Sequence, residues 1–149
     1  MYEFYVGTTP KDPPGNIVKV CLDSDGQLVD KSYYEAVSPA YLCRKGSCIY
    51  AVIENADFGG VQVFDVNKNG SLTAKARLDT EDVYSTYISA EKRGNRIFVA
   101  NYGTPSCAVY RYEAEKLVQE SVLREKKTEK SHIHCAALTP EEAYVCLVD

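Results

Sequence analysis

A short apolar run recurs at regular intervals along the chain, and this repetition restricts the possible folds more than any other feature. The clearest copy is Ile97–Ala100, where four apolar residues follow one another with no polar alternation. Such a run is typical of a short strand that is buried on both faces. The equivalent positions of four such runs are Tyr5, Tyr50, Phe98 and Cys146, at intervals of 45, 48 and 48 residues. A period of this size indicates a repeat architecture.

The segments between the apolar runs repeat in step with them. In the second copy they are an alternating strand at Gly59–Phe64, a turn at Asn69-Gly70, a strand at Leu72–Leu78 and a fourth segment at Tyr84–Ala90. The Asn-Gly pair tolerates the positive φ angles of a tight hairpin, whereas the third copy has Glu115-Lys116 there, which is a weaker turn sequence. The repeating unit is therefore predicted to be four short antiparallel strands.

A four-stranded unit of this length has the size of one β-propeller blade. Helical repeats of similar length would need long segments with a period of about 3.6 residues. The nearest candidate helix is Glu113–Lys130, but its apolar residues fit an exposed outer strand and a charged connector as well. We therefore predict an all-β fold, a β-propeller of four-stranded antiparallel blades.

The repeat also predicts the blade boundaries, if the fourth segment of each unit is the inner strand of the following blade. The inner strands are then expected at Ala40–Cys43, Tyr84–Ala90 and His132–Leu138. No separate second domain is expected, and two open sheet edges would favour self-association or pairing with remaining blades. The predicted units are blade 1 without its inner strand (2–37), blade 2 (39–80), blade 3 (84–126) and the start of blade 4 (132–149).

Composition excludes several classes of function. The 149 residues carry a formal net charge of −4, so neither a nucleic-acid surface nor an anionic membrane is an expected partner. The N-terminus has no basic lead-in before an apolar segment, and no apolar run is long enough to span a membrane. These features predict a cytoplasmic protein.

The six cysteines are scattered through apolar patterns without a C-x-x-C pair, so they are predicted to be reduced thiols. Cys135 follows His134 directly, which raises the possibility of a Cys–His nucleophile. Adjacent residues on a strand point to opposite faces, however, so these two side chains are expected to diverge.

Four segments together resemble the N-terminal part of the seven-bladed lactonase propeller family. They are FYVGTT at 4–9, IYAVIEN at 49–55, RIFVANYG at 96–103 and SHIHCAALTPEEAYVCLVD at 131–149. This family includes bacterial 6-phosphogluconolactonases and fungal carboxy-muconate lactonizing enzymes, and the resemblance covers about three of its seven blades. It implies hydrolysis of a sugar lactone, as in the 6-phosphogluconolactonase step of the pentose phosphate pathway. Two alternatives remain open, which are a muconate-type lactonizing enzyme and a non-catalytic binding propeller.

His132 and His134 are the only two histidines, and their spacing on a strand predicts that both project to the same face. In the repeat, His134 takes the place of Tyr41 and Tyr87, and these three positions are predicted to surround the central channel. The resemblance implies that His134 is an acid/base group, although Ser131 stands where the family often has proline. A structural role for His134 on a channel-lining strand is the alternative.

Weaker candidates for substrate binding are His132, Glu54, Asn101 and Tyr102. Asn101 and Tyr102 match the A-N-Y-G of the family, but Asn also ties off strand ends by bonding to backbone. The histidine pair lacks a third ligand, so no metal and no other cofactor is predicted.

The charged segment before the histidines supplies the last two candidates. Lys127 and Lys130 could meet the phosphate of a phosphorylated lactone, although such segments are usually solvated surface.

Overall fold

In the computed structural model, residues 1–9, 15–124 and 128–149 are described. Within these ranges the chain forms strands and no helix, which confirms the all-β prediction. The strands are β1 (Tyr2–Gly7), β2 (Gly15–Leu22), β3 (Leu28–Ala36), β4 (Leu42–Lys45), β5 (Cys48–Val52), β6 (Gly59–Val66), β7 (Leu72–Thr80), β8 (Ser85–Ala90), β9 (Arg96–Asn101), β10 (Ser106–Glu113), β11 (Lys116–Arg124), β12 (Cys135–Leu138) and β13 (Val145–Val148).

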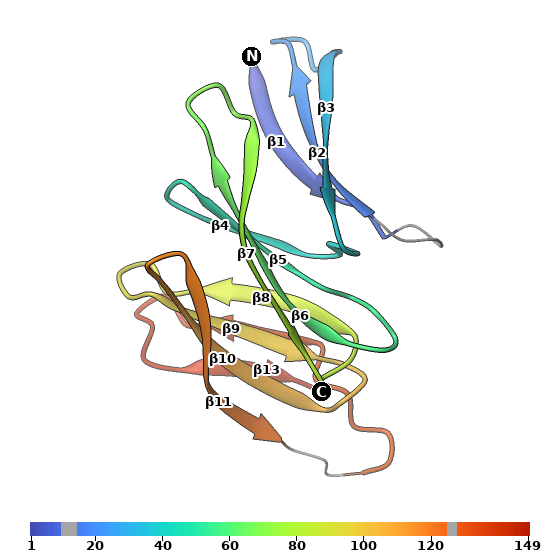
Figure 1. Cartoon of the computed structure of the whole chain (residues 1–149), viewed down its shortest axis with the longest axis vertical. Helices are drawn as coiled ribbons and strands as arrows, with labels where there is room; N and C mark the ends of the chain where they lie inside the picture. The colour runs from blue at the N-terminus through green and yellow to red at the C-terminus, as the bar shows by residue number, and fades with distance from the viewer. Residues whose placement is uncertain (10–14, 125–127) are drawn as a thin grey trace.

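These strands form four antiparallel sheets that follow one another from the N-terminal end of the molecule (Figure 1). The strand orders are β1-β2-β3, β4-β5-β6-β7, β8-β9-β10-β11 and β12-β13. Each sheet is a simple meander in which sequence neighbours are paired. The two middle sheets are complete four-stranded blades, so the predicted propeller architecture is confirmed.

The apolar runs of β5 and β9 are uninterrupted because these strands have other sheets on both of their faces. In β5, Ile49 and Ala51 pack toward the N-terminal sheet, in a cluster with Ile17. The alternate residues Tyr50 and Val52 pack on the opposite face. Successive side chains of a strand point to opposite faces, so a strand between two sheets needs apolar residues at every position.

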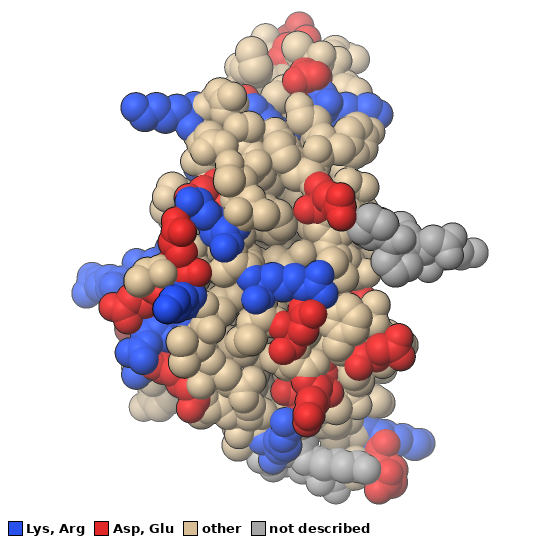
Figure 2. Space-filling view, in the orientation of Figure 1, with Lys and Arg blue, Asp and Glu red and all other residues tan. Residues whose placement is uncertain are grey.

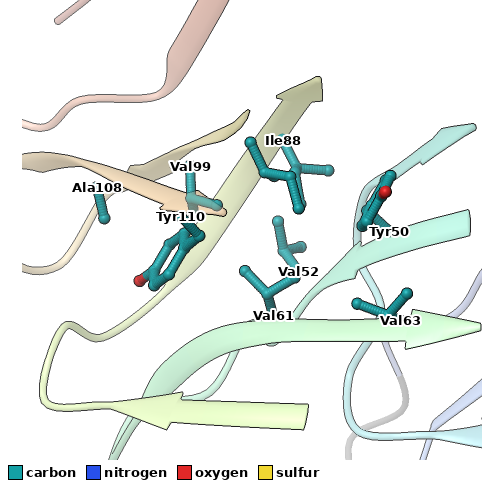
Figure 3. Close-up of a cluster of buried hydrophobic side chains, with 9 residues drawn as sticks. Tyr50, Val52, Val61, Val63, Ile88, Val99, Ala108 and Tyr110 are labelled. Carbon is teal, nitrogen blue, oxygen red and sulfur yellow. The ribbon is translucent and has the colours of Figure 1, made fainter. Parts of the chain in front are cut away.

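The largest core cluster joins the second and third sheets (Figure 3). Val61 and Val63 of β6 and Val99 of β9 are fully buried in it. Burial of such side chains contributes about 1.5–3 kcal/mol each, so this layer is a main source of cohesion between the two blades. The other members of the cluster are Tyr50, Val52, Ile88, Ile97, Ala108 and Tyr110.

The hairpin with the weaker turn sequence forms nevertheless. Ala114 and Glu115 connect β10 to β11, with φ angles of 49° and 60°. Two consecutive positive φ angles match the right-handed twist of the paired strands. Pairing of the long strands on either side therefore imposes a conformation that the local sequence alone does not favour.

Both outer strands of the middle sheets contain one extra residue relative to their neighbours. In β7 the extra residue is Lys75, because Val63 pairs with Ala76 and Phe64 pairs with Ala74. In β11 it is Glu120, at the equivalent break in register. These β-bulges present charged side chains: Lys75 Nζ lies 2.7 Å from the Glu115 carboxylate, and Glu120 lies 2.8 Å from Arg96 Nε.

The inner strands begin later than predicted. The first is Leu42–Lys45 instead of Ala40–Cys43, and the last begins at Cys135 instead of His132. The last strand is shorter because its partner β13 ends at Val148, which pairs with Cys135. His132 and His134 therefore precede the strand and do not lie within it.

Acidic and basic side chains are intermixed on the face shown in Figure 2, so this face has no extended surface of one sign. In the part of the chain that the structure describes, no helix is long and apolar enough to cross a membrane. None of the six cysteines, all of which lie in described ranges, is in a disulfide.

Candidate functional site

A cavity of about 430 Å³ is lined by Glu54, Tyr84, Thr86, Tyr102 and His134. Glu54 follows β5, Tyr84 and Thr86 lie at the beginning of β8, Tyr102 follows β9, and His134 precedes β12. Three successive sheets thus contribute to it, at the edge where β5 and β9 end and where β8 and β12 begin. Glu54, Tyr102 and His134 are candidates from the sequence, and the structure brings these three together.

Backbone hydrogen bonds connect the segments that carry these side chains. The Tyr84 N–H donates to the Asn55 carbonyl at 2.9 Å, and the Tyr102 N–H donates to the Tyr84 carbonyl at 2.9 Å. The His134 N–H donates to the Val148 carbonyl at 2.8 Å, which extends the β12–β13 ladder by one residue. The side chains around the cavity are therefore attached to fixed backbone.

His132 contacts Tyr102 and is not among the residues that line the cavity. Its ring is stacked on the Tyr102 ring, with centroids 4.1 Å apart and planes 8° apart. Its Nδ1 lies 2.9 Å from the Tyr102 carbonyl oxygen. A carbonyl oxygen can only accept, so Nδ1 carries the hydrogen, and in the neutral ring Nε2 is the basic nitrogen.

His134 is exposed in the cavity, and its ring meets the Tyr102 ring edge to face, with centroids 5.9 Å apart. Its predicted equivalence to Tyr87 is wrong by one residue. Tyr87 pairs with Ala100, and the corresponding pair in the last sheet is Cys135 with Val148. Tyr87 and Cys135 are 48 residues apart, like the apolar runs, so His134 corresponds in the repeat to Thr86, whose Oγ1 lies 3.5 Å from the His134 carbonyl oxygen.

Tyr41 and Tyr87 form a separate aromatic pair, with ring centroids 4.4 Å apart. Burial, together with the neighbouring Tyr41 hydroxyl, raises the pKa of Tyr87 above its usual value. Both tyrosines line a different groove, along the inner strands. Tyr41 and Tyr87 therefore line one hollow and His134 another, and their arrangement around a central channel stays a prediction.

Asn101 lies inside the blade and does not line the cavity. Its side chain is 0% exposed, its Oδ1 accepts from the Ser85 hydroxyl at 2.7 Å, and its Nδ2 donates to Ser106 Oγ at 2.9 Å. Asn101 thus joins the ends of three neighbouring strands. Asn101 therefore has a strand-end role, as in the alternative to substrate contact, but its partners are serine side chains and not the backbone.

A buried carboxylate continues this polar network. Asp82 is 2% exposed and accepts hydrogen bonds from Thr104 Oγ1 at 2.9 Å and Ser106 Oγ at 3.2 Å. It also forms an ion pair with Arg124 at the end of β11. A buried charge needs such partners, so these contacts fix the segment that leads into Tyr84.

The two lysine candidates are not placed at the cavity. Lys127 lies outside the described residues, and Lys130 has an exposed side chain in the segment before the histidines. No lysine or arginine is among the described residues around the cavity, where Glu54 is the one ionisable acid.

Within the described ranges, no three His, Cys, Asp or Glu side chains are grouped closely enough to hold a metal ion.

Tyr84 and Thr86 were not predicted as site residues. The alternation of polar and apolar residues where a strand begins does not show which residues face a cavity. An imidazole, a carboxylate and two phenols around one cavity can transfer protons and donate hydrogen bonds to a polar ligand.

Comparison with known proteins gives one family. The model of the family described as lactonase, 7-bladed beta-propeller, matches residues 3–149. The 6-phosphogluconolactonase of Bacillus subtilis is 29% identical over 161 residues, which cover 99% of this chain and 46% of that protein. An uncharacterized protein of Staphylococcus epidermidis is 25% identical and is also covered over 46% of its length. The chain therefore spans about half the length of the curated relatives it matches.

Solved structures share the fold at lower identity. The periplasmic gluconolactonase PpgL of Pseudomonas aeruginosa superposes with a TM-score of 0.82 at 22% identity, over 98% of this chain and 46% of that one. A protein of Lactobacillus plantarum superposes with a TM-score of 0.77 at 19% identity, over 97% and 45% of the two chains.

Proposed function

Since the chain belongs to the seven-bladed β-propeller lactonase family, we propose that it supplies the N-terminal blades of an enzyme that hydrolyses a sugar lactone. The observation that supports this proposal most directly is the cavity in which Glu54, Tyr102 and His134 meet. These residues come from three blades, as expected for a ligand site at one end of a propeller channel.

In the proposed reaction, the neutral imidazole of His134 accepts a proton from water as the water oxygen attacks the lactone carbonyl carbon. The carbonyl oxygen becomes an oxyanion, and hydrogen-bond donors around the channel stabilise it. Collapse of the tetrahedral intermediate breaks the bond to the ring oxygen. The protonated imidazole returns the proton to that oxygen, so the product is the open-chain hydroxy acid.

The substrate that we propose is a six-membered sugar lactone, as in the relative from Bacillus subtilis that is named a 6-phosphogluconolactonase. A phosphate on this substrate would have to meet cations beyond the described lining of the cavity, such as Lys130 or Lys127. A cytoplasmic role in the pentose phosphate pathway goes with the phosphorylated substrate. A role outside the cytoplasm goes with unphosphorylated gluconolactone, the substrate class in the name of the periplasmic relative.

A muconate-type lactonizing reaction is the second candidate. It would use the same cavity, because proton transfer at carbon also needs an acid/base group beside a carboxylate-bearing substrate. The negative charge of Glu54 at the cavity would repel the carboxylates of such a substrate, as it would repel a phosphate placed beside it.

The proposal is tested by steady-state hydrolysis assays on the longest folded polypeptide that contains this sequence. The substrates are 6-phosphoglucono-1,5-lactone, glucono-1,5-lactone and a muconolactone, each measured against its spontaneous hydrolysis. Turnover of either gluconolactone that is lost in His134→Ala supports the proposal. Turnover of the muconolactone alone favours the second candidate, and binding of gluconate without turnover of any lactone favours a non-catalytic binding propeller.

A further inference from the structure

The backbone of Tyr84 has a φ angle of 52°, in the left-handed region that bulky residues rarely adopt. The other non-glycine residues with positive φ in the described ranges are Ser38, Ala114, Glu115 and Glu142. All four are small or polar, and Tyr84 is the one aromatic residue in this set. Strained backbone of this kind persists where the surrounding structure holds it in place, and it concentrates at functional sites.

The surroundings hold Tyr84 from both sides. Its N–H donates to the Asn55 carbonyl of the preceding blade, and its carbonyl accepts from the Tyr102 N–H. The neighbouring Gly103 N–H donates to the Val83 carbonyl at 3.1 Å. Rotating Tyr84 into an ordinary strand conformation would break bonds that connect the segments on which Glu54 and Tyr102 are carried.

Gly103 provides the space that the Tyr84 ring occupies. A Cβ atom at position 103 would lie 2.8 Å from Tyr84 Cδ2 and 2.6 Å from Val83 Cγ2, closer than real Cβ contacts. The ring can therefore lie beside the backbone that follows β9 only because residue 103 has no side chain. Gly103 thus permits the position from which the Tyr84 ring lines the cavity.

Packing does not account for the choice of tyrosine at this position. The side chain of Tyr84 is 41% exposed and belongs to none of the three core clusters. A residue that is strained and half exposed adds little to the stability of the fold. What its conformation achieves is to place an aromatic face and a phenol hydroxyl at the cavity that also receives His134.

We infer that Tyr84 is a specificity-determining residue, whose ring is the wall on which the sugar ring of the substrate lies. This inference rests on the proposed lactone hydrolysis. An aromatic face accommodates the C–H face of a pyranose-like ring, and the phenol hydroxyl can bond to one of the ring substituents. Substrates without such a ring would lose this contact.

The test compares Tyr84→Gly with wild type in the longest folded polypeptide that contains this sequence. Glycine adopts this φ without strain, so the substitution removes the ring and the strain together. We expect an equal or higher Tm and a KM for glucono-1,5-lactone raised about tenfold, with a smaller change in kcat. Tyr84→Phe keeps the ring and should stay within about threefold of the wild-type KM.

Ala114→Gly is the matched control, because Ala114 has a similar φ of 49° but lies in the exposed β10–β11 hairpin. It should leave both KM and kcat unchanged. An unchanged KM in Tyr84→Gly, or a Tm lowered by more than that of the control, would overturn the inference and leave the lactone hydrolysis intact.

If the wild type hydrolyses no lactone, the proposed function fails, and the role of Tyr84 is then decided by calorimetry with glucono-1,5-lactam, a ring analogue that resists hydrolysis. Lactam binding that is present in the wild type and lost in Tyr84→Gly supports a role as a cavity wall. Lactam binding that is equal in the two proteins, or absent from the wild type, overturns it.

Discussion

The imidazole of His132 lies flat on the ring of Tyr102, and its Nδ1 donates to the carbonyl oxygen of the same residue. Two independent contacts with one partner fix both the plane and the tautomer of this histidine. The Tyr102 ring also contacts the His134 ring, edge to face. Tyr102 is therefore the element that positions the histidine pair.

Tyr102→Leu should lower kcat/KM for the substrate lactone about tenfold, because it removes the stacking surface of His132 and the edge contact of His134. The ring is 38% exposed, so Tm should change little. Tyr102→Phe keeps both ring contacts and is the control. Nitrogen-15 NMR of the imidazoles reports the tautomer directly, and an unaltered His132 spectrum with unaltered kinetics in Tyr102→Leu would contradict the positioning role.

His134→Ala should lower kcat/KM by about 10²–10⁴, the usual contribution of a general acid or base. His132→Ala should cost less, about tenfold, because His132 acts through Tyr102 and does not line the cavity. Initial rates with glucono-1,5-lactone measure both effects. Equal losses in the two variants would show that the histidines act as one unit, and a larger loss in His132→Ala would reverse the assignment.

Asn101→Ala should lower the free energy of unfolding by about 2–4 kcal/mol, because it removes the acceptor of the buried Ser85 hydroxyl and the donor to Ser106 Oγ. Urea denaturation measures this change. The KM of the folded fraction should equal that of the wild type, since Asn101 is fully buried. A raised KM with unchanged stability would return Asn101 to the list of substrate contacts.

Stability should decline in alkali because of Cys107. Burial raises the pKa of its thiol to about 11, from an ordinary value of 9.0. The unfolded thiol releases its proton first, so the stabilising contribution is complete below about pH 9 and is lost as the pH rises toward 11. Tm measured from pH 8 to 11 should fall less in Cys107→Ala than in wild type. Cys146→Ala, at an exposed position, should follow the wild-type curve.

The strands that could be predicted are those whose residues are determined by their neighbours on both faces. The uninterrupted apolar run at Ile97–Ala100 predicts a strand that is buried on both faces, and β9 has one hydrophobic cluster on each face. Turn residues such as Asn69-Gly70 marked the hairpins by their own conformational preferences. The repeat then predicted the four-stranded blade, because the strands assigned in one unit apply to the equivalent segments of the other units.

The beginnings of the inner strands could not be predicted in the same way. Their sequences lack an uninterrupted apolar run, so the alignment matched His134 with Tyr87, whereas strand pairing matches Tyr87 with Cys135, 48 residues away as for the apolar runs. The extra residue Thr86 in β8 is visible only in the pairing, because a bulge leaves the composition of a strand almost unchanged. Tyr84 gave no indication of its left-handed backbone, which elsewhere in the chain falls mainly on glycine or in polar turns.

The bulges at Lys75 and Glu120 affect how the molecule meets other molecules. Each lies in the outermost strand of a complete blade, where unpaired N–H and C=O groups could serve as a template for a foreign strand. For an incoming extended peptide, the bulge interrupts the regular spacing of backbone N–H and C=O groups along the edge strand. It also presents a charged side chain that is already engaged in ion pairs. The rim of the complete blades is therefore protected against fibril growth by strand addition, however many blades are placed side by side.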